Sequence, residues 1–171
     1  MTHFHRLFAD RAGSSAAEMA LVTPLLLVLM LGAVELGNYF LSEHVVQKAV
    51  RDASRYAGRL PMTSYPGCAP TTTAEQQVQR IAKAGDPDGD WDDDGNQDKR
   101  LQGWTADTMT TVTVTCDTSG TYTGLFVGYP DGVPVVTVSA TVPYPGLFGA
   151  LGLSSSTLNL NAESQSPVFG A

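Results

Sequence analysis

The sequence predicts an α+β protein in which a long N-terminal helix packs on a small antiparallel sheet. Three observations support this prediction. An uncharged apolar run near the N-terminus reads as a membrane helix, the next residues continue with helical periodicity, and the C-terminal part contains segments that alternate every second residue. We expect a helix and at least three strands, which together suffice for an independent domain.

The apolar run extends from Met19 to Val34 and contains no charged residue. At 1.5 Å per residue it is about 24 Å long, and it exceeds about 30 Å if Glu35 and Asn38 are tolerated near one interface. We therefore predict one membrane helix, in which Pro24 bends the helix without ending it. A cleaved secretory signal peptide is the first alternative, but "LGAVELGN" is a poor cleavage site.

The helical pattern continues beyond the apolar run. Small and apolar residues recur at three- and four-residue steps: Val46, Ala49, Val50, Ala53, Tyr56, Ala57 and Leu60. Polar residues occupy the other side, and Pro61 marks the end. We expect one helix from residue 14 to 60, whose outer half packs on its own globular domain.

The C-terminal part is predicted from its composition and alternation. Residues 61–74 read as a loop, 75–85 as a short helix, and 143–153 as a connection. Strands are predicted around 112–116, 135–142 and 157–164, with Val112, Val114 and Cys116 on one face. Residues 61–171 carry four basic and twelve acidic side chains, so we expect no nucleic-acid partner.

Catalysis is not expected. The three histidines are His3, His5 and His44, so none is available in the C-terminal part to activate a hydroxyl. Two cysteines cannot form a Cys-rich zinc site, and no glycine-rich phosphate-binding motif is present. The sequence therefore predicts a protein that is not an enzyme and has no small-molecule substrate.

A glutamate lies at the fifth position after a glycine, immediately before the apolar run. Gly13 and Glu18 follow a short polar leader, "MTHFHRLFADRAG", and this arrangement resembles the prepilin-peptidase site of type IV pilin-like proteins. Residues 11–57 more widely resemble the N-terminal region of TadE-like proteins, minor pilins or pseudopilins of the Tad (Flp, tight-adherence) pilus. The matching positions are Gly13, Glu18, Pro24, Gly32, Glu35, Gly37, Arg51, Ala53 and Arg55; Met19 departs from the aromatic residue usual there.

The resemblance implies a type IV pilin-like architecture and an inner-membrane precursor. Residues 1–13 would be a cytoplasmic leader removed by a prepilin peptidase, and residues 14–60 the membrane-spanning and projecting helix. Residues 61–171 would then form a domain outside the cytoplasm. Implied partners are the major Flp pilin, other minor pilins and membrane lipid. Pro24, Glu35, Arg51 and Arg55 would serve helix packing.

Cleavage after Gly13 would give Glu18 a partner. It would expose an amine on Ser14, which could pair with Glu18 of a neighbouring subunit and offset the desolvation of both groups. The alternative is that Glu18 reaches the lipid headgroups from a plain membrane anchor.

The acidic segment 86–98 contains a second motif. Asp90, Asp92, Asp94, Gly95, Asn96 and Asp98 match positions 1, 3, 5, 6, 7 and 9 of a calcium loop, although Leu101 replaces the glutamate at position 12. Calcium is the one cofactor that the sequence suggests, and a solvated acidic loop is the equal alternative. A membrane-anchored calcium-binding module unrelated to pili is therefore the second functional hypothesis.

Cys68 and Cys116 are the only two cysteines. In a domain outside the cytoplasm they would have an oxidising environment and only each other as partners within the chain. We therefore predict a disulfide between them. The alternative is a pair of buried free thiols.

Overall fold

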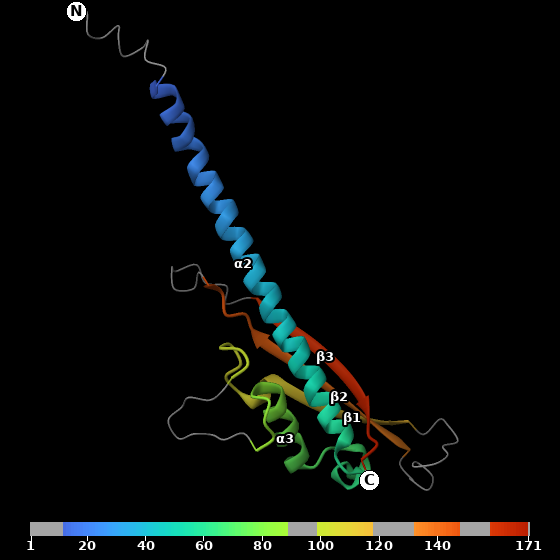
Figure 1. The fold of residues 1–171 in the computed structure, drawn as a ribbon. Helices are drawn as coiled ribbons and strands as arrows, with labels where there is room; N and C mark the ends of the chain where they lie inside the picture. Colours follow the sequence, from blue (N-terminus) through green and yellow to red (C-terminus); the bar gives the residue numbers. More distant parts are fainter. Residues whose placement is uncertain (1–11, 89–98, 118–131, 148–157, 171) are drawn as a thin grey trace, which may run out of the picture. The chain divides into compact units, whose positions relative to one another are not determined.

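A computed structural model describes residues 12–88, 99–117, 132–147 and 158–170, and the side chains from residue 15 onward. The chain divides into two compact units, residues 1–38 and 39–171. Helix α2 (Ala12–Arg59) runs through the first unit into the second (Figure 1). The outer half of this helix therefore belongs to the same unit as the sheet.

Helix α2 is continuous over 48 residues, and Pro24 does not end it. It ends one residue before the predicted Leu60, ahead of Pro61. Within the second unit its buried side chains are mostly small, namely Ser42, Val46, Ala49, Val50, Ala53, Ser54 and Ala57. Their spacing confirms the predicted core face, and their small size lets the helix lie close to the strands.

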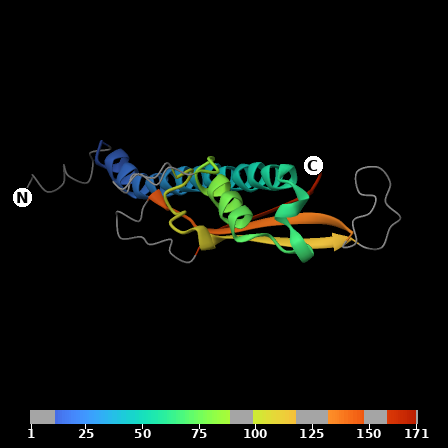
Figure 2. The same cartoon turned by 90° about the horizontal axis from the view of Figure 1, so that it is seen from below.

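Among the described residues, the sheet has three antiparallel strands in the order β1 (Thr110–Asp117), β2 (Val133–Pro143) and β3 (Asn159–Pro167). Val112 pairs with Val138, and Val142 pairs with Leu160. Figure 2 shows the helices of the second unit on one side of this sheet. The alternate residues Val136, Val138, Ala140 and Val142 face them and are almost fully buried, which confirms the predicted two-residue period.

Helix α3 (Thr72–Lys83) begins three residues earlier than predicted, inside the segment read as a loop. The reason is an N-cap: the Thr71 hydroxyl accepts a hydrogen bond of 3.3 Å from the backbone N–H of Ala74. The helix buries Ala74, Val78, Ile81 and Ala82 against the core. Gly85, with φ of 95°, follows its end, and its N–H donates to the carbonyl of Ile81 at 3.0 Å.

The end of α2 is held by residues from two other parts of the chain. The hydroxyl of Tyr65 donates to the carbonyl of Ala57 at 2.7 Å, and the backbone N–H of Phe169 donates to the carbonyl of Gly58 at 2.9 Å. A Cβ at Gly58 would lie 2.5 Å from the Ser166 hydroxyl oxygen. Tyr65 and Phe169 thus supply hydrogen-bond donors to carbonyls in the last turn of the helix.

Two buried features were not predicted from the sequence. Trp104 is fully buried, and the backbone of Gly103 lies directly against the carbonyl of Pro143, where no Cβ would fit. The segment that carries them precedes the short 3-10 turn η3 (Asp107–Met109) and β1. It closes the core next to the end of β2.

Candidate functional site: the exposed surfaces of the long helix

The predicted processing motif lies at the start of α2. Gly13 and Ser14 are within the first residues of the helix, and Glu18 lies on its exposed surface just over one turn beyond Ser14. The helix thus begins at the predicted cleavage point, and the glutamate stands between that point and the apolar run.

The apolar half of α2 is exposed along its whole described length. All side chains from Ser15 to Val34 are exposed, including Leu21, Leu25 and Leu29. Within the described residues, this is the one helix long and apolar enough to cross a membrane, judged by length and composition. The described chain thus leaves uncovered an apolar surface that water would disfavour, which makes this helix a candidate membrane anchor.

Pro24 has a local consequence within this helix. Proline lacks an N–H, so the carbonyl of Ala20 cannot receive the usual intrahelical hydrogen bond. One residue earlier, the Thr23 hydroxyl donates to the carbonyl of Met19 at 2.6 Å. The Thr23 hydroxyl, next to the proline, is therefore hydrogen-bonded within the helix although it lies in an apolar stretch.

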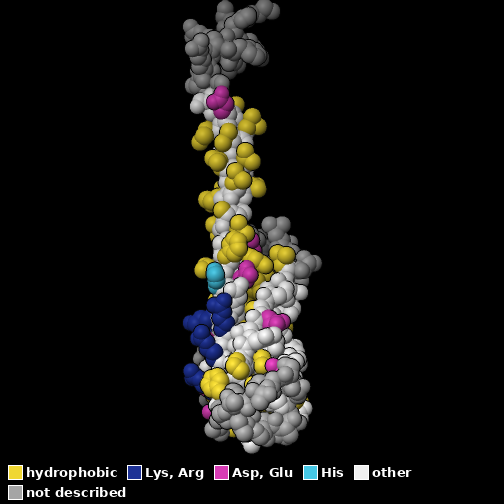
Figure 3. Space-filling view, turned by 90° about the vertical axis from the view of Figure 1, so that its right-hand side faces the viewer, with side chains coloured by type: hydrophobic (Ala, Val, Ile, Leu, Met, Phe, Trp, Pro, Cys, Tyr) yellow, Lys and Arg dark blue, Asp and Glu magenta, His cyan; other side chains and the backbone are white. Residues whose placement is uncertain are grey.

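The outer half of α2 carries a row of basic side chains on its exposed side. Lys48, Arg51, Arg55 and Arg59 recur every three or four residues, and all four are exposed. Figure 3 shows basic side chains gathered along this part of the molecule, with a histidine beyond them. We call these four residues the basic row. The predicted packing residues Arg51 and Arg55 thus point away from the core and are open to a partner.

An open hollow lies beside the basic row. It has a volume of about 370 Å³, and it is lined in part by Arg55, Tyr56, Arg59 and Arg100. Arg100 donates to Asp52 at 2.9 Å, which fixes one wall. Burial of the Tyr56 ring, together with the negative charge of Asp88, raises the pKa of its phenol. This ion pair was not predicted from the sequence, because 48 residues separate its partners.

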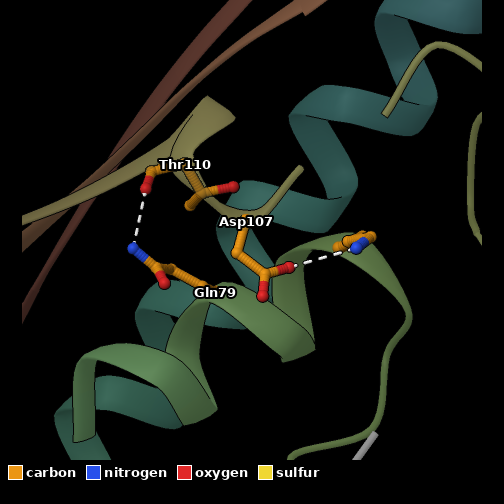
Figure 4. Close-up of polar contacts among 4 residues, drawn as sticks. Gln79, Asp107 and Thr110 are labelled. Atoms are coloured by element: carbon orange, nitrogen blue, oxygen red, sulfur yellow. Dashed lines mark hydrogen bonds and ion pairs between the residues drawn. The ribbon is translucent and has the colours of Figure 1, made fainter. Parts of the chain in front are cut away.

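A second unpredicted ion pair joins α3 to the segment before β1. Lys83 is buried, and its Nζ lies 3.2 Å from Oδ1 of Asp107. Figure 4 shows this contact beside the hydrogen bond of 3.1 Å from Gln79 to the carbonyl of Thr110. Together the contacts fix α3 against the start of the sheet.

The predicted disulfide is present between Cys68 and Cys116. It links the turn η2 (Pro66–Cys68), which follows η1 (Met62–Ser64), to strand β1. Gly67 and Cys68 both have positive φ, 60° and 61°. A left-handed conformation is unfavourable at Cys68, and the crosslink together with the permissive Gly67 accommodates it.

The predicted calcium ligands Asp90, Asp92, Asp94, Asn96 and Asp98 lie outside the described residues. Among the residues that the structure does describe, no group of three or more His, Cys, Asp or Glu side chains is placed to hold a metal ion. The calcium loop therefore stays a prediction from sequence.

These features describe an α+β domain whose core helix continues into an exposed apolar segment, a candidate membrane anchor. Residues 13–55 match the family model described as TadE-like protein, about a quarter of the chain. This segment is therefore TadE-like, and the match associates the chain with the Tad pilus, an assembly made through protein–protein contacts. Neither a curated protein nor a solved structure matches the chain.

Proposed function

We propose that this chain is a minor pilin or pseudopilin that takes part in assembly of the Tad (Flp) pilus through protein–protein contacts. The observation that supports this most directly is the exposed apolar half of α2, which coincides with the TadE-like match and begins at the Gly13–Glu18 motif. A helix that served only as a membrane anchor would require the apolar run but not a glycine five residues before Glu18.

The proposed topology places the N-terminus in the cytoplasm and residues 61–171 outside it. The disulfide supports this orientation, because disulfides persist in oxidising compartments and are rare in the cytosol. A prepilin peptidase would cut after Gly13 at the cytoplasmic face. The mature chain would then begin at Ser14, within the first turn of α2.

Glu18 then acts as the docking group between subunits. A lone carboxylate in hydrocarbon costs about 2.5 kcal/mol or more. The new Ser14 amine of a neighbouring subunit carries the opposite charge, so pairing of the two offsets their desolvation. The exposed side chain of Glu18 supports this role, because the described chain holds it in no ion pair.

The basic row offers a second contact surface, outside the membrane. Its four side chains are exposed on one side of α2, and salt-screened attraction would orient acidic groups of a partner toward them. We propose the major Flp pilin and other minor pilins as the partners. Catalysis and a small-molecule substrate are not part of this proposal.

Two substitutions separate cleavage from docking. A glycine before the scissile bond lets the peptidase approach the backbone closely, so Gly13→Val should leave the precursor uncut. The matched control is Gly32→Val, since a Cβ at Gly32 meets no atom within 4 Å. Glu18→Ala should be cut and inserted but should not support pilus formation, and Glu18→Gln should fail in the same way because it keeps the shape without the charge.

Each variant replaces the wild-type copy and is followed by N-terminal mass analysis and electron microscopy of surface fibres. We expect surface fibres on cells that make Gly32→Val and none on cells that make Gly13→Val or either Glu18 variant. Normal fibres from uncut Gly13→Val would show that cleavage is dispensable. Normal fibres with Glu18→Gln would overturn the docking role and leave Glu18 as a side chain that reaches the headgroups.

A further inference from the structure

An aromatic contact ties the end of β2 to α2 at the point where the apolar run ends. The rings of Tyr39 and Tyr144 meet edge to face, with their centroids 5.2 Å apart. Tyr144 directly follows β2, and its backbone N–H donates to the carbonyl of Leu158 at 2.9 Å. The end of β2, the residue before β3 and Tyr39 of the helix thus lie together in the second unit.

Exposed apolar side chains gather at this end of the unit. Between residues 39 and 171, the described large hydrophobic side chains that are exposed are Phe40, Leu41, Leu147, Leu158 and Phe169. Phe40, Leu41 and Leu147 are close in sequence to Tyr39 or Tyr144, and Leu158 accepts the backbone hydrogen bond of Tyr144. Leu147 and Leu158 are 50% and 49% exposed, and Leu41 is 68% exposed. We call Phe40, Leu41, Leu147 and Leu158 the apolar rim.

The charge pattern agrees with an apolar environment. No Asp, Glu, Lys or Arg occurs from Gly132 to Ala162, although the C-terminal part as a whole is strongly acidic. An anionic lipid surface would therefore not repel residues 132–162, and none of their side chains carries a charge that would be desolvated.

We propose that the apolar rim rests in the bilayer interface, so that the domain is seated on the lipid surface and not merely tethered to it by a helix. The proposal rests on the proposed membrane anchoring of α2. Lipid is the proposed contact of the apolar rim because α2 passes without a break from the exposed apolar run into Phe40 and Leu41. Leu158 accepts the hydrogen bond of Tyr144 and Leu147 follows Tyr144 by three residues, so both are close to the end of β2 that contacts Tyr39.

A single-label depth measurement tests the proposal on the full chain. Both native cysteines form the disulfide, so an introduced cysteine is the one free thiol. Leu147→Cys and Leu158→Cys would each carry an NBD label, with the protein at one copy per phosphatidylcholine nanodisc. Quenching by shallow doxyl-phospholipid is compared with quenching by a water-soluble agent.

Phe169→Cys is the matched control, because Phe169 is also 50% exposed and lies beside Gly58. Gly58 is about 27 Å farther along α2 than Phe40, beyond the reach of the interface. Leu29→Cys reports whether the helix is inserted at all. We expect a large loss of emission with the lipid quencher at residues 147 and 158 and little loss at residue 169.

The outcomes separate this inference from the proposed function. If the label at Leu29 is quenched by lipid while those at 147 and 158 respond like that at 169, the anchor stands and the seated domain is overturned. That result would instead favour a contact of the apolar rim with another subunit. If the label at Leu29 is not quenched, the anchor fails and the inference fails with it.

Discussion

Nζ of Lys83 lies 3.2 Å from Oδ1 of Asp107, and the lysine side chain is only 3% exposed whereas the aspartate side chain is 30% exposed. Water can therefore reach the Asp107 carboxylate when the lysine is removed, but it hardly reaches the Lys83 ammonium when the aspartate is removed. A buried ammonium without its counter-ion is costly, but a carboxylate that still reaches solvent is not.

This asymmetry predicts unequal effects of two substitutions. Asp107→Asn should lower the free energy of unfolding by about 2 kcal/mol, because the buried Lys83 ammonium loses its charge-assisted hydrogen bond to this carboxylate. Lys83→Met should cost clearly less, since methionine fills the volume and Asp107 stays hydrated. Urea unfolding of each variant in detergent checks this, and an equal loss in both would contradict the account.

The Cys68–Cys116 disulfide should contribute much of the stability of the domain. Its partners are 48 residues apart, and closing a loop of that length stabilises by about 4 kcal/mol in the chain-entropy model. Reduction of the wild type should therefore shift the urea midpoint strongly downward. The double variant Cys68→Ser and Cys116→Ser is the control, because reductant should not change its midpoint. An unchanged midpoint in the reduced wild type would show that the crosslink is not stabilising.

The raised pKa of Tyr65 predicts that the folded domain loses stability at alkaline pH. Burial, and secondarily the nearby Tyr56, raises the pKa of its phenol above the ordinary value of about 10. The folded state thus holds this proton more tightly than the unfolded state does. The resulting stability is fully present below about pH 10 and is lost as the pH rises toward the pKa of the folded state.

Tyr65→Phe provides the check on this pH dependence. It should flatten the fall of the unfolding free energy above about pH 10. At neutral pH it should cost about 1 kcal/mol, because the hydrogen bond to the carbonyl of Ala57 is lost. Unfolding measured across the pH range would contradict the account if the variant kept the full alkaline slope of the wild type.

The main elements of the fold could be predicted because each has its own periodicity. Val46, Ala49 and Ala53 mark the core face of the helix by their spacing, and Val136 and Val138 mark the buried face of β2. The disulfide was predictable because the chain offers one possible pair. The start of α3 was misplaced because a run of threonines reads as a loop, although Thr71 is its N-cap.

The long-range polar contacts were not predictable from the sequence. The pairs Lys83–Asp107 and Asp52–Arg100 join segments 24 and 48 residues apart, and no local pattern relates their members. The tertiary fold brings them together. The Tyr39–Tyr144 contact has the same origin, and the seated position of the domain could be inferred only after the structure placed these rings together.

The most direct test of the central claim is the intact mass and N-terminal sequence of the chain extracted from membranes of cells that make the pilus. We expect a mature protein that begins at Ser14 and has lost the thirteen residues before it. A chain that keeps Met1 to Gly13, or one cut beyond Glu18 so that the carboxylate is removed, would contradict it.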